Sequence, residues 1–269
     1  MGGCLTVPSA SERLSTAFRI ASGAGFEKEI VRTDTFLLTA YKRLTEPGKP
    51  LHIYIEGDGY AWVTRNRVSG DPTPREPMML SLAAEDPAPN VVYLARPCQY
   101  TPSAQNPKCN EFYWTDGRFS EEVVRSMDQA VSYFVEKAKA PGVDLIGYSG
   151  GAAVAVLVAA RRTDISSLRT IAGNLDPGLV NRYHEVSPLE GSLDPMEVAP
   201  QIASLPQLHF VGGDDETVPF EVVGSFLKQM GDERCFRIKT VPDASHKNGW
   251  VESWPQLLRE PVVCNEIPV

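Results

Sequence analysis

The sequence predicts an α/β fold with a mostly parallel central sheet. Short apolar runs bounded by turn residues alternate with longer segments of helical periodicity, and this alternation is typical of βαβ units. The apolar runs hold few polar residues, as expected for strands that helices cover on both faces of the sheet. The predicted strands lie at 35–44, 51–56, 90–95, 143–148, 168–172, 207–212 and 235–241.

Helical segments are expected between these strands. The clearest begins after Ser120, a good N-cap residue, and carries two glutamates in its first turn, where negative charge is favourable. Apolar residues recur at helical spacing as far as Ala138, and a Pro-Gly pair then stops the pattern. Further helices are expected at 220–230 and 249–258.

The predicted domain organisation is a single α/β domain at 34–269, preceded by an amphipathic N-terminal arm at 1–33. Three long loops near 60–77, 96–118 and 175–206 interrupt the alternation of strands and helices. Ligands bind outside the carboxyl ends of the strands in open sheets of this type. We therefore expect the three loops to form a small cap over a site at that edge.

The composition is that of an ordinary globular protein, with 42% hydrophobic and 22% charged residues among 269. The formal net charge of −8 and the lack of any Lys/Arg-rich run argue against a nucleic-acid partner. No Cys/His cluster suggests a metal, and no cofactor is expected. The longest apolar stretch is shorter than the roughly 18 residues that a bilayer requires. The oligomeric state is left open.

The pentapeptide Gly147-Tyr148-Ser149-Gly150-Gly151 is the most informative motif of the chain. It follows the apolar run 143–146 and precedes the apolar segment 152–160, so that strand, sharp turn and buried helix follow one another. A Gly-x-Ser-x-Gly in this setting is the nucleophile elbow of an α/β-hydrolase, which holds the serine in a strained backbone conformation. We therefore expect Ser149 to be a nucleophile. An ordinary glycine-rich turn is the alternative for the pentapeptide alone.

A serine nucleophile needs a base within hydrogen-bond reach and an acid that orients the base. The order along an α/β-hydrolase chain is serine, acid, histidine. Of the four histidines, only His246 follows the last predicted strand, and it is therefore the expected base. The frame Gly212-x-x-Asp215-x-x-Val218-Pro219 favours Asp215 over Asp214 as the acid, and Asp176 is a weaker alternative.

An oxyanion hole would require two backbone N–H groups. One is expected from Gly150, and the other from Asp58 in the loop that follows the strand 51–55. Gly57, Gly59, Tyr60 and Tyr148 are further candidate pocket residues. An ordinary tight turn is the alternative for this loop.

The cysteines support more than one interpretation. Cys98 and Cys109 lie eleven residues apart in a Pro-rich loop, and their spacing fits a disulfide or two free thiols equally well. Gly3-Cys4 matches the end of a bacterial lipoprotein signal, but the apolar stretch that should precede it is missing. Lipidation of Cys4 and an incidental cysteine are both compatible with the sequence.

Nearly the whole chain resembles the α/β-hydrolase superfamily. Four segments resemble a group of little-characterised bacterial α/β-hydrolases that are often predicted lipoproteins; they are 54–59, 96–100, 147–151 and 172–176. The resemblance implies a Ser149, His246 and Asp215 triad, a Cys98–Cys109 disulfide and a truncated lipidation signal at Cys4. The chain departs from familiar lipases where Glu56-Gly57-Asp58-Gly59 replaces a His-Gly loop, which weakens the assignment of the oxyanion donors.

The expected function is that of a serine hydrolase that cleaves an ester, thioester or amide through an acyl-enzyme. The substrate is expected to be a small-molecule or lipid-like acyl compound. An acyltransferase with the same triad and a catalytically silent envelope binding protein are the alternatives. The expected location is the bacterial cell envelope, with membrane contact only through a lipid anchor, and a cytoplasmic enzyme is the alternative.

Overall fold

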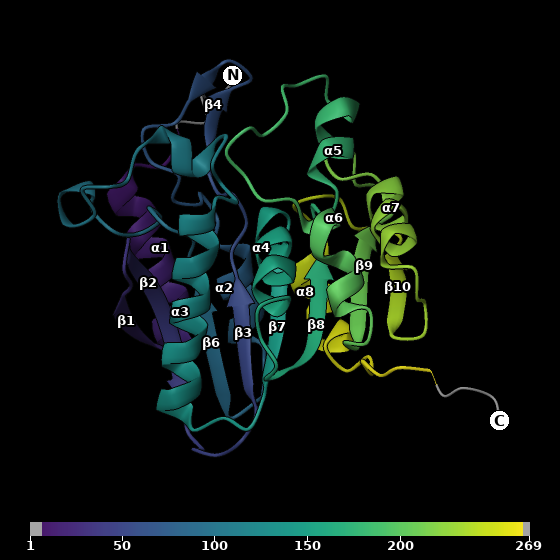
Figure 1. Ribbon diagram of the computed structural model, residues 1–269. Helices are drawn as coiled ribbons and strands as arrows, with labels where there is room; N and C mark the ends of the chain where they lie inside the picture. The colour runs from purple at the N-terminus through teal and green to yellow at the C-terminus, as the bar shows by residue number, and fades with distance from the viewer. Residues whose placement is uncertain (1–6, 266–269) are drawn as a thin grey trace.

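The computed structural model describes residues 7–265. Its strands in the main sheet are β1 (Glu27–Arg32), β2 (Leu37–Leu44), β3 (Leu51–Ile55), β6 (Asn90–Leu94), β7 (Val143–Tyr148), β8 (Ile165–Ile171), β9 (Gln207–Gly212) and β10 (Phe236–Val241). The strand order is β1-β2-β6-β3-β7-β8-β9-β10 (Figure 1). Neighbouring strands from β6 to β10 are parallel, whereas β2 is antiparallel to both β1 and β6. The prediction of a mostly parallel α/β sheet is confirmed.

Helices cover both faces of the sheet. One face carries α3 (Glu121–Ala138), α4 (Gly150–Ala159), α6 (Pro195–Val198) and α7 (Phe220–Met230), and the opposite face carries α1 (Ala10–Gly23), α2 (Met78–Ala84) and α8 (Trp250–Leu257) (Figure 1). Every residue of α4 is buried, as expected for a helix that is apolar all round. Successive side chains of β3 point to opposite faces, so Ile53 and Tyr54 belong to different apolar clusters.

The segment predicted as an N-terminal arm contributes α1 and the edge strand β1 to this layered body. Helix α1 begins with a capping box between Ser9 and Glu12 and contacts α2. Its buried positions include Ala17 and Ala21, whereas Phe18 is 63% exposed. None of the helices in the part of the chain that the structure describes combines the length and the apolar character that a bilayer crossing requires.

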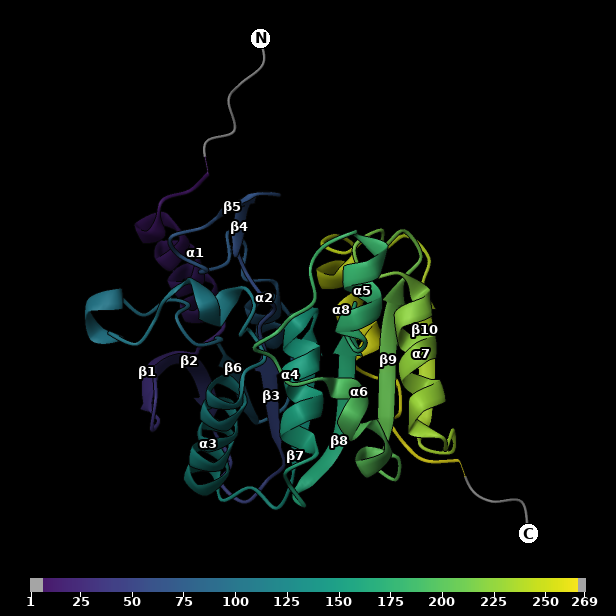
Figure 2. The same ribbon diagram turned by 45° about the horizontal axis from the view of Figure 1, so that its top comes forward.

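The carboxyl ends of β3, β7, β8 and β9 lie at one edge of the sheet, at the top of Figure 1. The three long loops hold short elements, namely β4 (Trp62–Thr64) and β5 (Arg67–Val68), the 3-10 turns η1 (Ser103–Gln105) and η2 (Glu111–Trp114), α5 (Pro177–Tyr183), α6 and the 3-10 turn η3 (Ala199–Ile202). Figure 2 turns this edge toward the viewer and shows the β4–β5 hairpin and α5 on either side of it. These loops therefore flank the strand ends at which the sequence places its site.

Two disulfides tie surface segments to the fold. Cys98 is bonded to Cys109, within the second long loop, with the α-carbons 5.6 Å apart. This is the pair that the family resemblance implies. Cys235 is bonded to Cys264, which attaches the segment after α8 to the start of β10. The second pair was not predicted, and Cys4 lies outside the described residues.

Candidate active site

Ser149 occupies the sharp turn between β7 and α4. Its φ of 51° and ψ of −122° are unfavourable for a residue with a β-carbon, and such a conformation costs about 1–3 kcal/mol. The surrounding backbone holds it there, because the Ser149 N–H donates to the carbonyl oxygen of Ile171 at 3.0 Å. The Ser149 carbonyl oxygen accepts from the N–H groups of Ala152 and Asn174, both at 3.0 Å.

The glycines of the elbow are required by close approach of the backbone. A β-carbon at Gly147 would lie 2.6 Å from the carbonyl oxygen of Gly151. A β-carbon at Gly151 would collide with the carbonyl oxygens of Ile55 and Glu56, at the end of the neighbouring strand. These contacts leave room only for glycine on both sides of Ser149.

The structure brings together the three residues that the chain order singles out. His246 Nε2 lies 3.1 Å from Ser149 Oγ, and His246 Nδ1 lies 2.9 Å from Asp215 Oδ2. The other carboxylate oxygen of Asp215 accepts hydrogen bonds from the N–H groups of Thr217 at 2.8 Å and Val218 at 2.9 Å. The Asp215 side chain is fully buried and that of His246 is 10% exposed. Ser149, His246 and Asp215 thus form one continuous hydrogen-bonded line.

The competing candidates make other contacts. Asp214 forms no hydrogen bond to an imidazole among the described residues, and its N–H donates to the carbonyl oxygen of Ala244. Asp176 caps α5 and accepts from the hydroxyl of Ser225 at 2.6 Å. His184 Nε2 lies 2.8 Å from the carbonyl oxygen of Thr217. Of these candidates, the structure brings His246 and Asp215 to Ser149.

The loop after β3 lies next to the elbow, as expected for a source of oxyanion donors. The Asp58 carboxylate lies over the α-carbon of Gly150, where any side chain would collide with it. The N–H of Gly57 donates to the carboxylate of Glu56 at 3.0 Å, so this N–H is already engaged. Asp58 and Gly150, the two residues predicted to supply the donors, are therefore neighbours in space.

Comparisons with known proteins agree on the fold. No protein-family model and no curated protein matches the chain. Among solved structures, the Pyrococcus furiosus esterase Pf2001 is 16% identical at a TM-score of 0.61, over 88% of this chain and 92% of that one. Est1E from Butyrivibrio proteoclasticus is 15% identical at a TM-score of 0.59, over 86% of this chain and 95% of that one. An α/β serine hydrolase homologue from Coxiella burnetii is 16% identical at a TM-score of 0.55, over 86% and 93% of the two chains.

The chain has the α/β-hydrolase fold. In this fold the elbow, the acid and the histidine follow strands of the central sheet in that order, and here they follow β7, β9 and β10. The similarity to lipoproteins has no support among the named structures.

Glu56 is buried at the start of the loop that follows β3. Its carboxylate accepts from the Gly57 N–H and from the Tyr93 hydroxyl at 3.1 Å. Burial raises the pKa of Glu56 to about 7, against the opposing effect of these hydrogen bonds. Glu56 also interacts electrostatically with Tyr148 and Arg96.

Two arginines from the second long loop hold Asp58. Arg96 Nη1 lies 3.4 Å from Asp58 Oδ1, and Arg118 Nε lies 3.3 Å from Asp58 Oδ2. Gln99 from the same loop donates to the carbonyl oxygen of Gly57 at 3.0 Å. Sequence reasoning missed these arginines, although Arg96 lies in one of the four segments that carry the family resemblance.

The remaining candidate pocket residues divide into two groups. Tyr148 lies at the site, since its ring centre is 5.2 Å from that of His246 and its ring contacts Gly57. Gly59 is exposed at φ 68°, and Tyr60 packs under the guanidinium of Arg75 at 5.1 Å. The structure thus brings Tyr148 and Gly57 to the triad and places Tyr60 at the loop's outer side.

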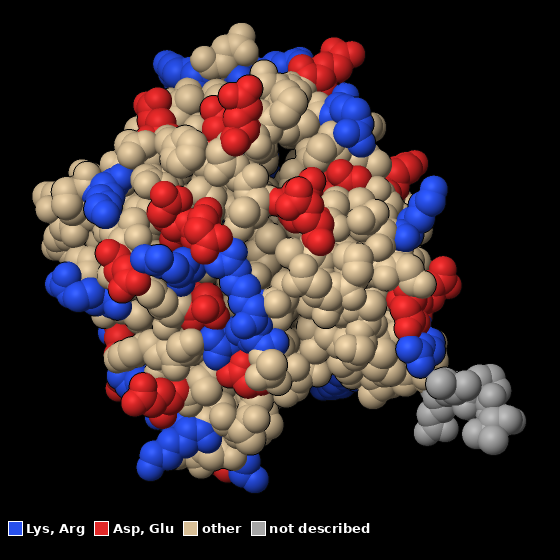
Figure 3. Space-filling model, viewed as in Figure 1, with Lys and Arg blue, Asp and Glu red and all other residues tan. Residues whose placement is uncertain are grey.

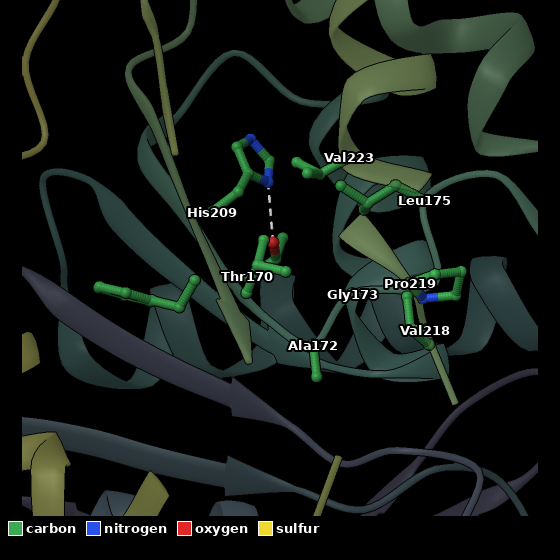
Figure 4. Close-up of a pocket in the computed structure, with 10 residues that line it drawn as sticks. Thr170, Ala172, Gly173, Leu175, His209, Val218, Pro219 and Val223 are labelled. Atoms are coloured by element: carbon green, nitrogen blue, oxygen red, sulfur yellow. Dashed lines mark hydrogen bonds between the residues drawn. The ribbon is translucent and has the colours of Figure 1, made fainter. Parts of the chain in front are cut away.

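A small cavity lies behind the loop of Asp215, between β8, β9 and the start of α7 (Figure 4). It is lined by apolar side chains, including Leu175 and Val218, and by His209, whose Nδ1 lies 2.8 Å from the Thr170 hydroxyl. Burial lowers the pKa of His209 to about 3, so the ring stays neutral. The cavity volume of about 10 Å³ has room for one water molecule at most, which excludes it as a substrate pocket.

The site contains no set of side chains suited to a metal. Within residues 7–265, no group of three or more His, Cys, Asp or Glu side chains is arranged to hold a metal ion.

Proposed function

We propose that the protein is a serine hydrolase that forms an acyl-enzyme on Ser149. The observation that carries this proposal is the continuous hydrogen-bonded line from Ser149 through His246 to Asp215, on a strained turn between a strand and a helix. An imidazole in contact with a serine hydroxyl on one side and a buried carboxylate on the other is the arrangement that activates a serine nucleophile.

In the first half of the proposed reaction, Ser149 Oγ attacks the substrate carbonyl carbon while His246 Nε2 takes the hydroxyl proton. The Asp215 carboxylate holds Nδ1 protonated and stabilises the imidazolium. The negative charge on the carbonyl oxygen is stabilised by the N–H groups of Gly150 and Asp58. His246 then returns its proton to the leaving group, and the acyl group remains on Ser149.

In the second half, water takes the place of the leaving group. His246 removes a proton from the water as it attacks the acyl carbon, and the proton then passes to Ser149 as the acid is released. An alcohol in place of water would make the reaction an acyl transfer.

The substrate proposed for this site is an ester of modest size. One of the named structures with the same fold is the Pyrococcus furiosus esterase Pf2001, which matches this chain over 92% of its own length. Thioesters and amides would react by the same steps, but an amide has the poorer leaving group.

Labelling with a fluorophosphonate probe and turnover of a p-nitrophenyl ester series test the proposal. We expect the wild-type protein to be labelled and to hydrolyse short-chain esters, and Ser149→Ala to lose both activities while it keeps its circular dichroism spectrum and melting temperature. Full labelling of the variant would remove Ser149 from the mechanism, and an unlabelled, inactive wild type would support a catalytically silent protein.

We also propose that the native protein is anchored in a bacterial cell envelope by lipidation at Cys4, which lies outside the described residues. The proposal rests on the Gly3-Cys4 pair and the polar segment after it. Fractionation of the native host and mass spectrometry of the N-terminal peptide test it. A diacylated Cys4 in the membrane fraction is expected, whereas an unmodified Met1 on protein from the cytoplasmic fraction would end the proposal.

A further inference from the structure

Two guanidinium groups lie against a single carboxylate beside the proposed oxyanion hole. The Asp58 carboxylate lies over Gly150, and the guanidinium groups of Arg96 and Arg118 both lie against that one carboxylate. Two guanidinium groups therefore share the one carboxylate that both contact. The buried carboxylate of Glu56 also interacts electrostatically with Arg96, and it is hydrogen-bonded to Gly57 and Tyr93.

The arginines retain unused hydrogen-bonding capacity. The Arg96 side chain is 95% buried, and within the described residues its Nε has no hydrogen-bond partner. The Nε of Arg118 is also without a hydrogen-bond partner there, because its 3.3 Å approach to Asp58 is not aligned for donation. A buried donor without a partner costs stability, so the present contacts do not fully satisfy either guanidinium group.

The two guanidinium groups are fixed in place. Both stack on the ring of Phe119, at 5.5 Å for Arg96 and 5.3 Å for Arg118. Arg96 also donates to the carbonyl oxygen of Arg118. A rigid pair of arginines loses little conformational entropy on binding, and the planar fork of a guanidinium matches the oxygens of a carboxylate or phosphate.

Of the two arginines, Arg118 is the one that a ligand can reach. Its side chain is 14% exposed, against 5% for Arg96, and the side chain of Asp58 between them is 24% exposed. Acidic and basic side chains are interspersed over the face shown in Figure 3, and the net charge of the chain is −8. Recognition of an anion at the site would therefore depend on this cluster.

We propose that Arg118, supported by Arg96, binds an anionic group of the substrate, so that the preferred substrates are esters that carry a carboxylate or phosphate near the reacting carbonyl. The inference rests on the proposed hydrolase function and specifies its substrate class. In this proposal Asp58 has two roles, because its side chain holds both arginines and its N–H stabilises the oxyanion.

The test compares two p-nitrophenyl esters of equal acyl length, the hydrogen glutarate monoester, which is anionic, and the valerate ester, which is neutral. Arg118→Gln should lower kcat/KM for the glutarate ester about 10- to 100-fold more than for the valerate ester, mainly through KM, because a hydrogen bond to a charged group contributes about that factor. A smaller loss shared by both esters is expected from the weaker hold on Asp58. Arg118→Lys should recover part of the preference. Arg125→Gln, which removes an exposed arginine on α3, is the matched control.

An equal loss on both esters would show that Arg118 only holds the loop, and no loss on either would show that it has no part in substrate binding. Either result overturns the proposal. Calorimetric titration of Ser149→Ala with glutarate and with inorganic phosphate separates carboxylate from phosphate recognition without turnover. Glutarate or phosphate binding that requires Arg118 would support the subsite even if the hydrolase function failed, and no binding of either anion would count against it.

Discussion

The hydroxyl of Tyr148 donates a hydrogen bond to the main-chain carbonyl oxygen of His246 at 3.0 Å. The residue directly before the nucleophile therefore positions the base, which lies 98 residues further along the chain. The same carbonyl oxygen lies 3.2 Å from Trp250 Nε1, at the first residue of α8. Two side-chain donors, from Tyr148 and Trp250, thus fix the backbone of the histidine loop relative to the elbow.

Removal of the Tyr148 hydroxyl should impair catalysis without abolishing it. Tyr148→Phe keeps the ring against His246 but loses one of the two hydrogen bonds. Because a hydrogen bond of this kind contributes about 0.5–1.5 kcal/mol, we expect kcat to fall about 2- to 10-fold. Steady-state kinetics with a p-nitrophenyl ester measure the effect, and Tyr133→Phe on the exposed side of α3 is the control. Unchanged kcat in Tyr148→Phe would show that the Trp250 contact is sufficient.

His246 is expected to be the only histidine that catalysis requires. His246→Ala should lower kcat by at least about 10⁴-fold, because loss of a triad base leaves only the oxyanion hole and substrate binding. His184→Ala is the matched control, since its imidazole contacts the carbonyl oxygen of Thr217 and not Ser149. Single-turnover measurements on both variants decide the assignment, and a greater loss in His184→Ala would contradict it.

Adjacent aspartates provide a sharper test of the acid. Asp215→Asn keeps the size of the side chain but removes the charge that stabilises the His246 imidazolium, so kcat should fall about 10³- to 10⁴-fold. Asp214→Asn should change kcat less than about 3-fold, within the range that surface substitutions usually show. The reverse ranking would shift the acid by one residue.

Much of this candidate site could be predicted because its sequence motifs are short or occur in a known order along the chain. The elbow is one pentapeptide between a strand and a helix, and the chain order then reduces four histidines to His246. The sequence frame around Asp215 is informative because the N–H groups of the following residues Thr217 and Val218 donate hydrogen bonds to its carboxylate. Each signal lies within a few residues of the group that it identifies.

The missed features depend on contacts between distant segments. Asp58 meets Arg96 and Arg118, which lie 38 and 60 residues further along the chain, and no local pattern marks that meeting. The pairing of Cys235 with Cys264 likewise depends on the path of the segment after α8, which no local pattern predicts.

Edge elements were missed for a different reason. Strand β1 has the sequence Glu-Lys-Glu-Ile-Val-Arg, which lacks the apolar run of an inner strand because one of its faces is exposed throughout and the other is buried only at Val31. In α1 the buried stripe runs through Arg13, Ala17 and Ala21, so the apolar residues at Leu14 and Phe18 lie beside it.

A buried ion cluster at the other end of the sheet should make stability depend on pH. His52 Nδ1 lies 2.7 Å from Asp86, and His52 Nε2 lies 3.4 Å from Asp144. Burial alone would lower the pKa of His52, but the hydrogen bonds and charges of Asp144 and Asp86 raise it to about 9. The ion pairs also hold the pKa of each carboxyl below its usual value, although burial opposes this.

Because the folded pKa of His52 exceeds its unfolded value of about 6.5, its contribution to stability is complete below pH 6.5 and is lost as the pH rises through about 9. The carboxyl groups act in the opposite direction, since their contribution is present above about pH 4 and is lost at lower pH. Urea unfolding of the wild type and of His52→Gln between pH 6 and pH 10 measures this. The difference in unfolding free energy should shrink over that range, and a difference independent of pH would refute the assignment.

The Cys98–Cys109 disulfide should support both the fold and the site. It lies within the loop that carries Arg96 and Arg118 to Asp58. The chain-entropy relation gives about 3 kcal/mol for closing a loop of this length, so Cys98→Ser/Cys109→Ser should lose about 2–4 kcal/mol of stability.

A looser loop should also hold Asp58 less firmly and lower kcat, whereas the corresponding change of Cys235 and Cys264, far from Ser149, should affect stability alone. Urea unfolding and ester kinetics on both double variants, after peptide mapping of the oxidised wild type, separate these effects. Equal kcat in the two variants, or free thiols at 98 and 109 in the oxidised wild type, would contradict a role for this disulfide at the site.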